Sequence, residues 1–400
     1  MERPFAFVTV TAKAERSLRD RHPWVYGEEI LAASGPYENG DIVDVRSQGG
    51  KWLGAGFIND HSKIRVRLLS RNPNDRYDDA FFARRVRYAV DYRAQIMGGD
   101  FADCRLVFGE ADGLPGLTVD RFENVLVTQC LCLGMERRME FIIAELLRTL
   151  YARGAEISAV YRRNDVATRE KEGLAQEKGF AYGAGDGHVR ITENGVRYDV
   201  DYINGQKTGF FLDQKYNRAA VARLAGGCRV LDLFTHTGAF GLNCALAGAE
   251  KVVSVDVSAD ALECAARNAA LNGFSVEYRQ ADVFELLTRL AAEKCRDYDL
   301  IILDPPAFTK SGATLKSAVR GYKEINLKAM KLLPRGGFLA TCSCSHFMTD
   351  ELFRRMLSDA ARDADVSLKQ IEARQQGPDH PIAWDVPETD YLKFYLFQVV

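Results

Sequence analysis

The sequence predicts a multidomain protein with three parts: an N-terminal β-barrel, a small α+β middle domain and a C-terminal α/β doubly wound domain. Three observations support this fold class. The chain has 400 residues, which is more than one compact domain usually holds. Short strands separated by glycine-containing turns fill residues 1–71. After about residue 216, strands alternate strictly with helices.

The composition is that of an ordinary globular protein, with 47% hydrophobic and 27% charged residues. We expect a cytoplasmic protein without a membrane partner, because no run of about 18 apolar residues and no secretory signal is present. The net charge of −2 confines any nucleic-acid contact to a local basic patch. Nine cysteines without a C-x-x-C pair favour reduced thiols, and we expect no metal site.

The N-terminal part, residues 1–71, is predicted to be a small β-rich module. Its strands have alternating or β-branched residues, and turns such as Glu38–Asp41 separate them. The predicted strands are Phe7–Thr11, Asp41–Arg46, Trp52–Ile58 and Ile64–Leu69.

The middle part, residues 72–190, begins after the turn-rich junction Arg71–Asp75. Apolar residues at helical spacing predict helices over Phe81–Met97 and Met139–Tyr151. Helices and strands do not alternate strictly, which is typical of an α+β domain. The predicted strands are Cys104–Phe108, Leu117–Arg121, Asn124–Leu131 and Ile157–Tyr161.

The C-terminal part, residues 191–400, starts with a predicted hairpin whose turn is Glu193–Gly195. The alternation that follows predicts a parallel doubly wound sheet, with an antiparallel hairpin at its edge because no helix separates the last two strands. The predicted strands are Arg229–Phe234, Val252–Val257, Val276–Gln280, Asp299–Leu303, Gly337–Cys342, Ser367–Ala373 and Leu392–Val399. The predicted helices are Phe240–Ala247, Ala259–Leu271, Val283–Glu293, Leu315–Leu333 and Glu351–Ala361.

Acidic residues stand at the ends of three successive strands of this sheet, where ligands of such sheets bind. Asp232 precedes the turn Thr235–Gly238, and its charge disfavours a phosphate and favours a cofactor with an amino group. Asp256 can hydrogen-bond both hydroxyls of a ribose. Asp282 suits the exocyclic amine of an adenine. Each acid alone could be a helix N-cap, but together they predict a nucleoside cofactor.

Residues 216–400 resemble class I S-adenosylmethionine-dependent methyltransferases, which have a Rossmann-like domain. The resemblance implies that S-adenosyl-L-methionine is the cofactor, with its methionine part at Asp232 to Gly238. The segment Asn204–Gln214 resembles one that lines this pocket in an RNA-modifying branch, and a linker with a hydrophobic anchor is the less favoured alternative. The predicted cofactor-binding residues are Phe211, Asp232, Phe234, Thr235, Gly238, Asp256, Asp282 and Asp304.

The fourth strand of the sheet ends in the motif Asp304-Pro305-Pro306-Ala307-Phe308. Two prolines fix the chain direction, so Asp304 is presented rigidly at the strand end, with Phe308 as a base-stacking surface. A stiff loop with a solvated acid is the alternative interpretation. In methyltransferases, Asn at the first position is typical for exocyclic amines, whereas Asp is common where a ring carbon is methylated.

A thiol stands at the end of the fifth strand, in Ser343-Cys344-Ser345. Attack of a thiolate on carbon 6 of a pyrimidine makes carbon 5 nucleophilic enough to take a methyl group. We predict that Cys344 is this nucleophile, whereas Cys342, within the strand, is a buried structural residue. The thiol must ionise, so cationic or dipolar help is expected nearby. His346 could assist, but a lone histidine is more often structural.

The motifs at Asp304 and Cys344 are similar to those of bacterial 23S rRNA cytosine-C5 methyltransferases of the RlmI type, over nearly the whole chain. This resemblance implies that Cys344 is the catalytic nucleophile. It also implies that Asp304 is catalytic, contacting the base edge and assisting protonation of the ring nitrogen.

The segments His22–Tyr26 and Leu53–Asn59 resemble a PUA domain, a β-barrel module that binds structured RNA. Lys63, Arg65 and Arg67 alternate on one strand and therefore share a face. We expect them to contact RNA as a set, although a solvated surface is the better interpretation for any one of them.

The predicted function is therefore transfer of a methyl group from S-adenosyl-L-methionine to carbon 5 of a cytosine in ribosomal RNA, expected to be 23S, through a covalent cysteine adduct. The sequence does not predict the oligomeric state, and a homodimer is compatible with it. One alternative is an RNA N-methyltransferase acting on a guanine or adenine amine, where no thiol is needed. Another is a non-catalytic RNA-binding assembly factor, against which the intact Asp232, Asp256 and Asp304 argue.

Overall fold

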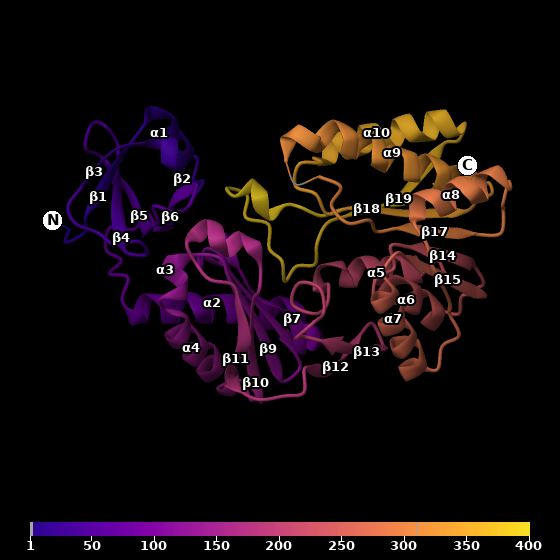
Figure 1. Cartoon of the computed structure of the whole chain (residues 1–400), viewed down its shortest axis with the longest axis horizontal. Helices are drawn as coiled ribbons and strands as arrows, with labels where there is room; N and C mark the ends of the chain where they lie inside the picture. The colour runs from indigo at the N-terminus through magenta and orange to yellow at the C-terminus, as the bar shows by residue number, and fades with distance from the viewer. Residues whose placement is uncertain (1–2, 310) are drawn as a thin grey trace. The chain divides into compact units, whose positions relative to one another are not determined.

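The computed structural model describes residues 3–309 and 311–400, and the chain folds into two compact units (Figure 1). The first unit contains the chain up to Arg190 and also the segments Val200–Leu212 and Pro378–Thr389. The second unit consists of Ile191–Asp199, Asp213–Gly377 and Asp390–Val400. Within the described residues, no helix combines the length and apolar character needed to cross a membrane.

Two segments that we predicted to belong to the C-terminal part, within residues 191–400, are thus found in the first unit. Specific hydrogen bonds hold them there. The Thr208 hydroxyl donates to the Asp120 carboxylate at 2.5 Å. The Arg105 backbone N–H donates to the Asp379 carboxylate at 2.9 Å. Both contacts join residues more than 80 positions apart, which no local pattern in the sequence signals.

The N-terminal part forms a six-stranded mixed sheet in the order β2-β6-β5-β4-β1-β3 around its own apolar core. The four predicted strands are confirmed. The sequence analysis missed one helix and two strands, because β2 is only three residues long and β3 is mostly exposed, without alternation. The strands are β1 (Phe7–Val10), β2 (Trp24–Tyr26), β3 (Ile30–Ser34), β4 (Ile42–Arg46), β5 (Trp52–Ile58) and β6 (Ile64–Ser70), and the helix is α1 (Ala12–Arg19).

Arg67 does not join a solvated basic face as expected. It is mostly buried, with its guanidinium 2.8 Å from the Glu110 carboxylate and 3.2 Å from that of Glu172. Although burial opposes it, these two carboxylates raise the pKa of Arg67. Arg65 pairs with Asp60 at 2.8 Å. The prediction that Lys63, Arg65 and Arg67 contact RNA as a set is therefore wrong for Arg67. Its guanidinium instead forms internal ion pairs.

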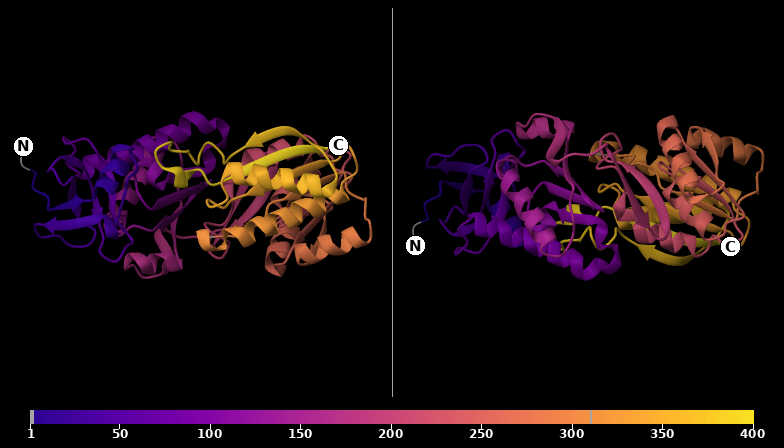
Figure 2. Two further views of the ribbon diagram at one scale, coloured as in Figure 1. Left: turned by 90° about the horizontal axis from the view of Figure 1, so that it is seen from above. Right: turned by 90° about the horizontal axis from the view of Figure 1, so that it is seen from below.

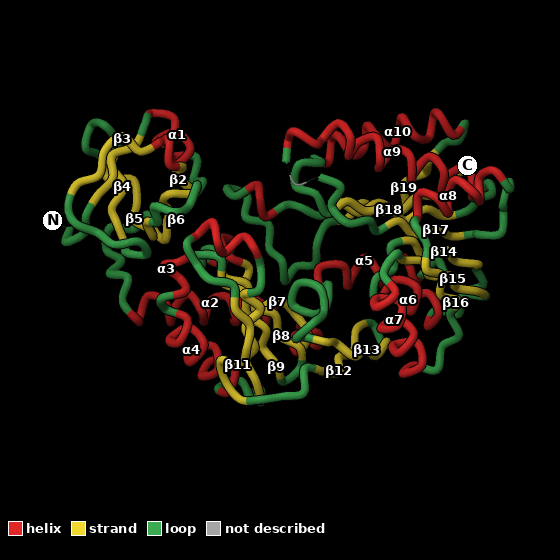
Figure 3. The backbone as a smooth tube through the Cα atoms, in the orientation of Figure 1, coloured by secondary structure: helices red, strands yellow, loops and turns green. Residues whose placement is uncertain are grey.

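The middle part forms a five-stranded sheet in the order β11-β10-β9-β8-β7, with α2 and α4 packed on each other and α2 on β7 (Figure 3). This agrees with the predicted helices and strands, except that the exposed strand β11 and the four-residue helix α3 were missed. The strands are β7 (Asp103–Phe108), β8 (Leu117–Phe122), β9 (Val125–Cys130), β10 (Ala159–Asn164) and β11 (Glu177–Gly183). The helices are α2 (Asp79–Met97), α3 (Leu133–Glu136) and α4 (Met139–Tyr151).

The second unit is built on a seven-stranded sheet in the order β16-β15-β14-β17-β18-β20-β19. The first five strands are parallel, and β20 is antiparallel to both of its neighbours, which confirms the predicted doubly wound sheet with an antiparallel edge. The strands are β14 (Arg229–Leu233), β15 (Lys251–Asp256), β16 (Glu277–Gln280), β17 (Leu300–Leu303), β18 (Phe338–Ser343), β19 (Leu368–Arg374) and β20 (Lys393–Val399). The preceding hairpin, β12 (His188–Glu193) and β13 (Val196–Asp201), was also predicted.

Helices cover both faces of this sheet (Figures 1 and 2). Alternate residues of a strand point to opposite faces. Leu231 and Leu233 of β14 pack in the core under α8, α9 and α10, whereas Val230 packs with residues of α5 and α6 on the other face. The helices are α5 (Lys215–Ala222), α6 (Ala239–Leu246), α7 (Ala259–Asn272), α8 (Val283–Ala292), α9 (Leu315–Leu332) and α10 (Asp350–Ala364).

Candidate active site

The register of the second unit's sheet brings the predicted acids to one edge. Leu233 of β14 pairs with Val255 of β15 and with Leu303 of β17, so Asp256 and Asp304 follow directly at the carboxyl ends of the neighbouring strands. Asp282 comes two residues after the end of β16. Parallel strands thus gather these carboxylates where ligands of open α/β sheets bind.

Asp232 is fully buried near the end of β14 and holds one unused acceptor. Its Oδ2 accepts hydrogen bonds from the Thr235 hydroxyl at 2.5 Å and from the Gly241 backbone N–H at 2.9 Å. Its Oδ1 is buried without a hydrogen-bond partner among the described residues. Burial raises the pKa of Asp232 to about 7. An incoming ammonium group would satisfy this oxygen and stabilise its charge, so the site fits the amino group of a methionine moiety.

The loop after β14 adopts backbone conformations that are unusual for its residues. Phe234 and His236 have φ values of 62° and 50°, in the left-handed region, and Gly238 has a φ of 85°. At Phe234 and His236 such conformations cost about 1–3 kcal/mol each, and they cluster at functional sites, whereas the glycine at 238 adopts a positive φ without strain. The loop turns tightly beneath the carboxyl edge, and Gly238 begins α6 as its N-cap. Thr235 of this loop contacts Asp232 directly, and the roles of Phe234, Thr235 and Gly238 in holding the methionine end of the cofactor stay predictions.

Asp256 and Asp282 are held differently. The two Asp256 oxygens accept backbone N–H groups, from His236 at 2.9 Å and from Ser258 at 3.0 Å, so the carboxylate has a fixed orientation. Asp282 is exposed, caps α8 through one oxygen and lies near the same edge. Val257 is 67% exposed beside Asp256 and offers apolar surface that the sequence analysis did not single out.

Asp304 receives two hydrogen bonds from neighbours within the second unit. The Gln214 side-chain amide donates to Asp304 Oδ1 at 2.9 Å, and the Cys342 thiol hydrogen-bonds the same carboxyl group. The Gln214 orientation is fixed in turn, because its Oε1 accepts from the buried Asn217 amide at 2.6 Å. Burial raises the pKa of Asp304 to about 6, so a fraction of the molecules carries a proton there near neutral pH.

Phe308 belongs to an aromatic cluster. Its ring centroid lies 4.5 Å from that of Tyr322, 5.7 Å from Phe284 and 6.3 Å from Phe234. Phe284 stands two residues after Asp282 in the first turn of α8, and Phe234 follows β14. The Phe308 ring thus packs against side chains of the loops that carry the cofactor acids, which restricts the open base-stacking face that we expected for it.

The two cysteines near Asp304 have different environments. Cys342 is fully buried within β18, and burial raises the pKa of its thiol well above the usual range. Cys344 comes just after β18 and is only partly buried, with its Sγ 3.9 Å from the Pro305 carbonyl oxygen. The Ser345 hydroxyl donates to the Thr309 carbonyl at 3.0 Å and ties the two loops together. Cys344 is therefore the more accessible thiol beside the Asp304 motif.

Lys393 supplies a buried cation near Cys344. It begins β20, opposite Ser343 of β18, and its ammonium donates to the backbone carbonyls of Ser345 at 2.6 Å and Tyr391 at 2.7 Å. Burial lowers the pKa of Lys393 to about 8, and the charge of Cys344 opposes this change. Lys393 is thus a candidate for the cationic help that we expected for a reactive thiol, and a role of His346 stays a prediction.

Phe211 lies in the first unit, in the segment Val200–Leu212. Its ring is covered by the Lys207 ammonium, 4.3 Å from the ring centroid. Its cofactor contact stays a prediction.

Besides Val257, the sequence analysis missed Gln214 and Lys393 as site residues. Each is distant in sequence from the residue to which it donates a hydrogen bond. Gln214 is 90 positions before Asp304, and Lys393 is 48 positions after Ser345. Their positions inside recognisable motifs were a weak signal. Gln214 ends the segment that resembles a pocket lining, and Lys393 follows Tyr391-Leu392 in the C-terminal strand.

Comparison with known proteins adds two family matches and close relatives. Residues 162–398 match the S-adenosylmethionine-dependent methyltransferase family, and residues 8–71 match the PUA-like domain family. The chain is 43% identical over 385 residues to Ribosomal RNA large subunit methyltransferase I of Shewanella denitrificans, covering 95% of this chain and 96% of that protein. It is 42% identical to the protein of the same name from Aeromonas salmonicida, covering 97% and 98%.

Two solved structures have the same fold. One is described as an S-adenosylmethionine-dependent methyltransferase from Streptococcus mutans and has a TM-score of 0.82 at 20% identity, covering 98% of this chain and 99% of that chain. The other is a methyltransferase-type protein complexed with SAH, the demethylated cofactor, and has a TM-score of 0.83 at 20% identity with the same coverage.

Proposed function

Because the chain belongs to the S-adenosylmethionine-dependent methyltransferase family, we propose that it methylates carbon 5 of a cytosine in ribosomal RNA, through a covalent adduct with Cys344. Its cofactor is S-adenosyl-L-methionine. Relatives at 42–43% identity over nearly the whole chain bear the name of a large-subunit ribosomal RNA methyltransferase, which supports 23S rRNA as the substrate. One observation carries the carbon-5 proposal: an accessible thiol beside the Asp304 loop, with a buried lysine near it.

Four residues of the second unit would hold the cofactor. Asp232 accepts its ammonium group, and Asp256 accepts the ribose hydroxyls. Asp282 lies at the adenine end, and Val257 offers apolar contact there. When bound, S-adenosyl-L-methionine supplies the electrophilic methyl group that carbon 5 takes up.

The chain's own groups activate the base. The Cys344 thiolate forms a bond to carbon 6 of the cytosine, and the ring electrons move toward ring nitrogen 3. Asp304, with its raised pKa, donates a proton or a strong hydrogen bond to that nitrogen. Carbon 5 then becomes the nucleophile. After methylation, solvent water takes up the carbon-5 proton, the bond between carbon 6 and Cys344 breaks so that the sulfur leaves as thiolate, and ring nitrogen 3 returns its proton to Asp304, which restores the aromatic ring.

Gln214 and Cys342 act as positioning residues in this proposal. Both donate hydrogen bonds to the Asp304 carboxyl group, which orients it. Lys393 stabilises the Cys344 thiolate through its charge. Cytoplasmic action and the oligomeric state stay predictions, and sedimentation of the purified protein would check for a homodimer.

The test compares two single variants, Cys344→Ala and Cys342→Ala, on 23S rRNA from cells that lack this methyltransferase. Labelled methyl transfer is measured, and nucleosides of the product are identified by mass spectrometry. We expect 5-methylcytidine with the unaltered protein and none with Cys344→Ala, while calorimetry shows unchanged cofactor affinity for that variant.

Cys342→Ala is expected to keep measurable activity, because its thiol only orients Asp304. A methylated amine of guanine or adenine as product would contradict the carbon-5 proposal. Full activity of Cys344→Ala with loss of activity in Cys342→Ala would reverse the assignment of the nucleophile.

A further inference from the structure

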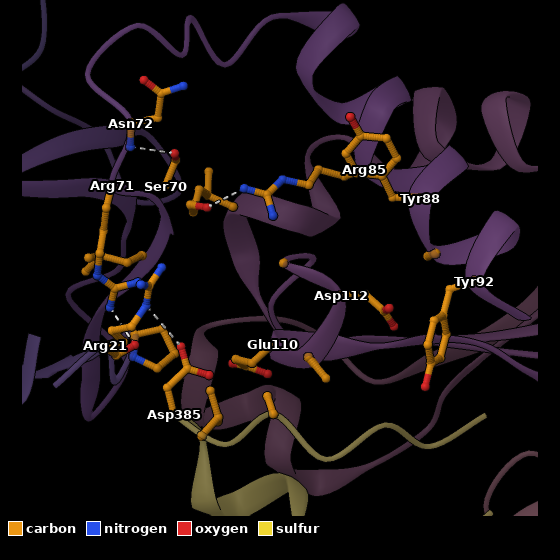
Figure 4. A pocket seen from close by; sticks show the side chains of 18 residues that line it. Arg21, Ser70, Arg71, Asn72, Arg85, Tyr88, Tyr92, Glu110, Asp112 and Asp385 are labelled. Carbon is orange, nitrogen blue, oxygen red and sulfur yellow. Dashed lines mark hydrogen bonds and ion pairs between the residues drawn. The ribbon is translucent and has the colours of Figure 1, made fainter. Parts of the chain in front are cut away.

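The first unit contains a polar pocket of about 710 Å³ (Figure 4). It shares no residue with the candidate active site. Residues from four places line it: the N-terminal module with the junction after it, helix α2, the loop Glu110–Gly113 and the segment Pro378–Thr389. Its volume falls within the range of about 300–1,000 Å³ that is typical of small-ligand sites. The residues that carry the argument are Arg21, Arg71, Arg85, Tyr88, Tyr92 and Asp385.

The acids at the floor of this pocket are already neutralised. The Glu110 carboxylate lies 2.8 Å from the Arg67 guanidinium, and it also accepts from the Trp24 indole N–H at 2.9 Å. The Asp112 carboxylate lies 2.5 Å from the Arg93 guanidinium. Arg67 and Arg93 do not line the pocket. Glu110 and Asp112 therefore contribute little negative charge to it.

Two of the lining arginines lack a carboxylate partner. Arg71 donates to the backbone carbonyls of Arg21 and His22, and Arg85 donates to that of Leu69. Among residues 3–309 and 311–400, neither guanidinium forms an ion pair with a carboxylate. Burial lowers the pKa of both groups, and it outweighs the charges of Asp385 on Arg71 and of Asp75 on Arg85, which act without forming an ion pair. A phosphate would supply that missing charge with bidentate geometry.

The opposite wall of the pocket presents tyrosines on one face of α2. Tyr88 and Tyr92 are one helical turn apart and are 61% and 39% exposed. Trp384 stands between the lining residues Ala383 and Asp385 and is 98% exposed. Figure 4 shows Tyr88 and Arg85 together on α2, facing the group formed by Arg21, Arg71 and Asp385. Arginines combined with exposed aromatic rings are what single-stranded nucleic acid requires, since bases stack on rings and phosphates pair with cations.

We propose that this pocket binds an unpaired nucleotide of the RNA substrate, with its base stacked on Tyr88 and its phosphates contacting Arg71 and Arg85. The base must be unpaired, because stacking on a protein ring requires a base face that a duplex would cover. The proposal rests on the proposed function, in that RNA is the substrate. It gives the first unit a defined recognition site for a single-stranded segment that flanks the target cytosine.

The test uses the full-length protein and three variants. Tyr88→Ala removes the ring, and Tyr88→Phe keeps it. Tyr182→Ala is the matched control, since Tyr182 is 43% exposed on β11 and does not line the pocket. Affinity for a short fluorescein-labelled oligouridylate is measured by fluorescence anisotropy. A 4-thiouridine version of the oligonucleotide is photo-crosslinked, and the attached peptides are mapped by mass spectrometry.

We expect Tyr88→Ala to weaken oligouridylate binding by roughly tenfold or more, as for loss of one base-stacking platform. Tyr88→Phe and Tyr182→Ala should bind like the unaltered protein. Crosslinks should map to Arg85–Tyr92 or to Pro378–Thr389. All variants should keep the same affinity for S-adenosyl-L-methionine, which shows that they are folded.

Unchanged binding by Tyr88→Ala, or crosslinks confined to other peptides, would overturn the proposal. So would equally effective displacement of the oligonucleotide by oligoglutamate of the same charge or by a duplex RNA, because the site would then read charge alone. Methylation of 23S rRNA by the unaltered protein is measured in parallel. If that methylation is absent while Tyr88→Ala still loses oligonucleotide binding, the proposed function fails and the pocket remains. If methylation occurs and the binding is unchanged, only the pocket fails.

Discussion

Asp232 makes cofactor affinity depend on pH at the scale of a single residue. Its pKa is about 7 because it is buried, so its carboxyl group is increasingly protonated as the pH falls below 7. The neutral acid attracts the cofactor's ammonium group less than the carboxylate does. We therefore expect the dissociation constant of S-adenosyl-L-methionine to rise as the pH falls from 8 to 5.5, approaching about tenfold per unit below 7. Isothermal titration calorimetry checks this.

Asp232→Asn serves as the control for this prediction. It should bind the cofactor weakly at every pH in that range, without the acid-side loss. An unaltered protein whose affinity stays flat from pH 8 to 5.5 would contradict the role that we assign to the unpartnered Oδ1.

Lys393 should control how readily the Cys344 thiol ionises. Lys393→Met removes the nearby positive charge, so the thiolate loses its stabilisation. We expect alkylation of Cys344 by iodoacetamide to need a pH higher by up to about one unit. Mass spectrometry of the modified peptide gives the pH dependence and separates Cys344 from Cys342.

A lysine elsewhere in the same sheet provides the comparison for Lys393. Lys369→Met, on the exposed face of β19, should leave the alkylation profile unchanged. An unshifted profile for Lys393→Met would show that another group stabilises the thiolate.

Single residues also show what the sequence could and could not predict about the site. Asp232, Asp256, Asp304 and Cys344 were identifiable, because each stands at or just after the carboxyl end of a strand whose apolar pattern is strong. Gln214 was not, because its contact with Asp304 bridges 90 positions and depends on the way in which α5 meets β17.

At the scale of elements, α6 can lie against β14 and β15 only because residue 241 is glycine. A Cβ atom at Gly241 would lie 2.6 Å from the Ser254 hydroxyl and 3.0 Å from Asp232 Oδ2. Gly241→Ala should therefore displace the helix, with a loss of about 1–3 kcal/mol in the free energy of unfolding. Cofactor affinity should fall as well. Thermal denaturation and calorimetry measure the two effects.

Gly312→Ala is the matched control in the same unit, since a Cβ atom there has no neighbour within 4 Å. It should leave stability and cofactor affinity unchanged. Equal behaviour of the two variants would mean that the contact around Gly241 relaxes without cost.

Element prediction succeeded for most segments with one buried face, although the short helices α1 and α5 were missed. The strands of the seven-stranded sheet were found because alternate residues enter two separate cores. The missed strands β3 and β11 are mostly exposed on both faces, so their side chains carry no period-two hydrophobic pattern. Their pairing depends on backbone hydrogen bonds, which the pattern of side chains in the sequence does not reveal.

At the scale of the whole molecule, Arg93 joins distant parts of the first unit. It is fully buried on α2, lies 2.5 Å from the Asp112 carboxylate and donates to the Asp379 carbonyl at 2.9 Å. Arg93→Met should cost about 3–5 kcal/mol in unfolding free energy, because Asp112 would remain buried without its counter-ion. Hydrogen exchange in Pro378–Thr389 should also become faster.

Arg84→Met on the same helix is the comparison. Arg84 is partly exposed and pairs with Asp75 at 3.2 Å, so its loss should cost less than about 1 kcal/mol. Denaturant unfolding and exchange mass spectrometry measure both variants. Equal losses of unfolding free energy and equal exchange rates in Pro378–Thr389 would contradict the tethering role of Arg93.

The division of the chain between the two units also affects the order in which the protein can fold during translation. Arg93 and Asp379 are 286 positions apart, so a ribosome that adds about 5–20 residues per second needs roughly 15–60 s between them. During that interval the Arg93 guanidinium lacks the Asp379 carbonyl as a hydrogen-bond acceptor. The nascent first unit therefore stays incomplete until almost the entire chain has been translated, and messages truncated near their 3′ end should yield a product that cellular proteases remove.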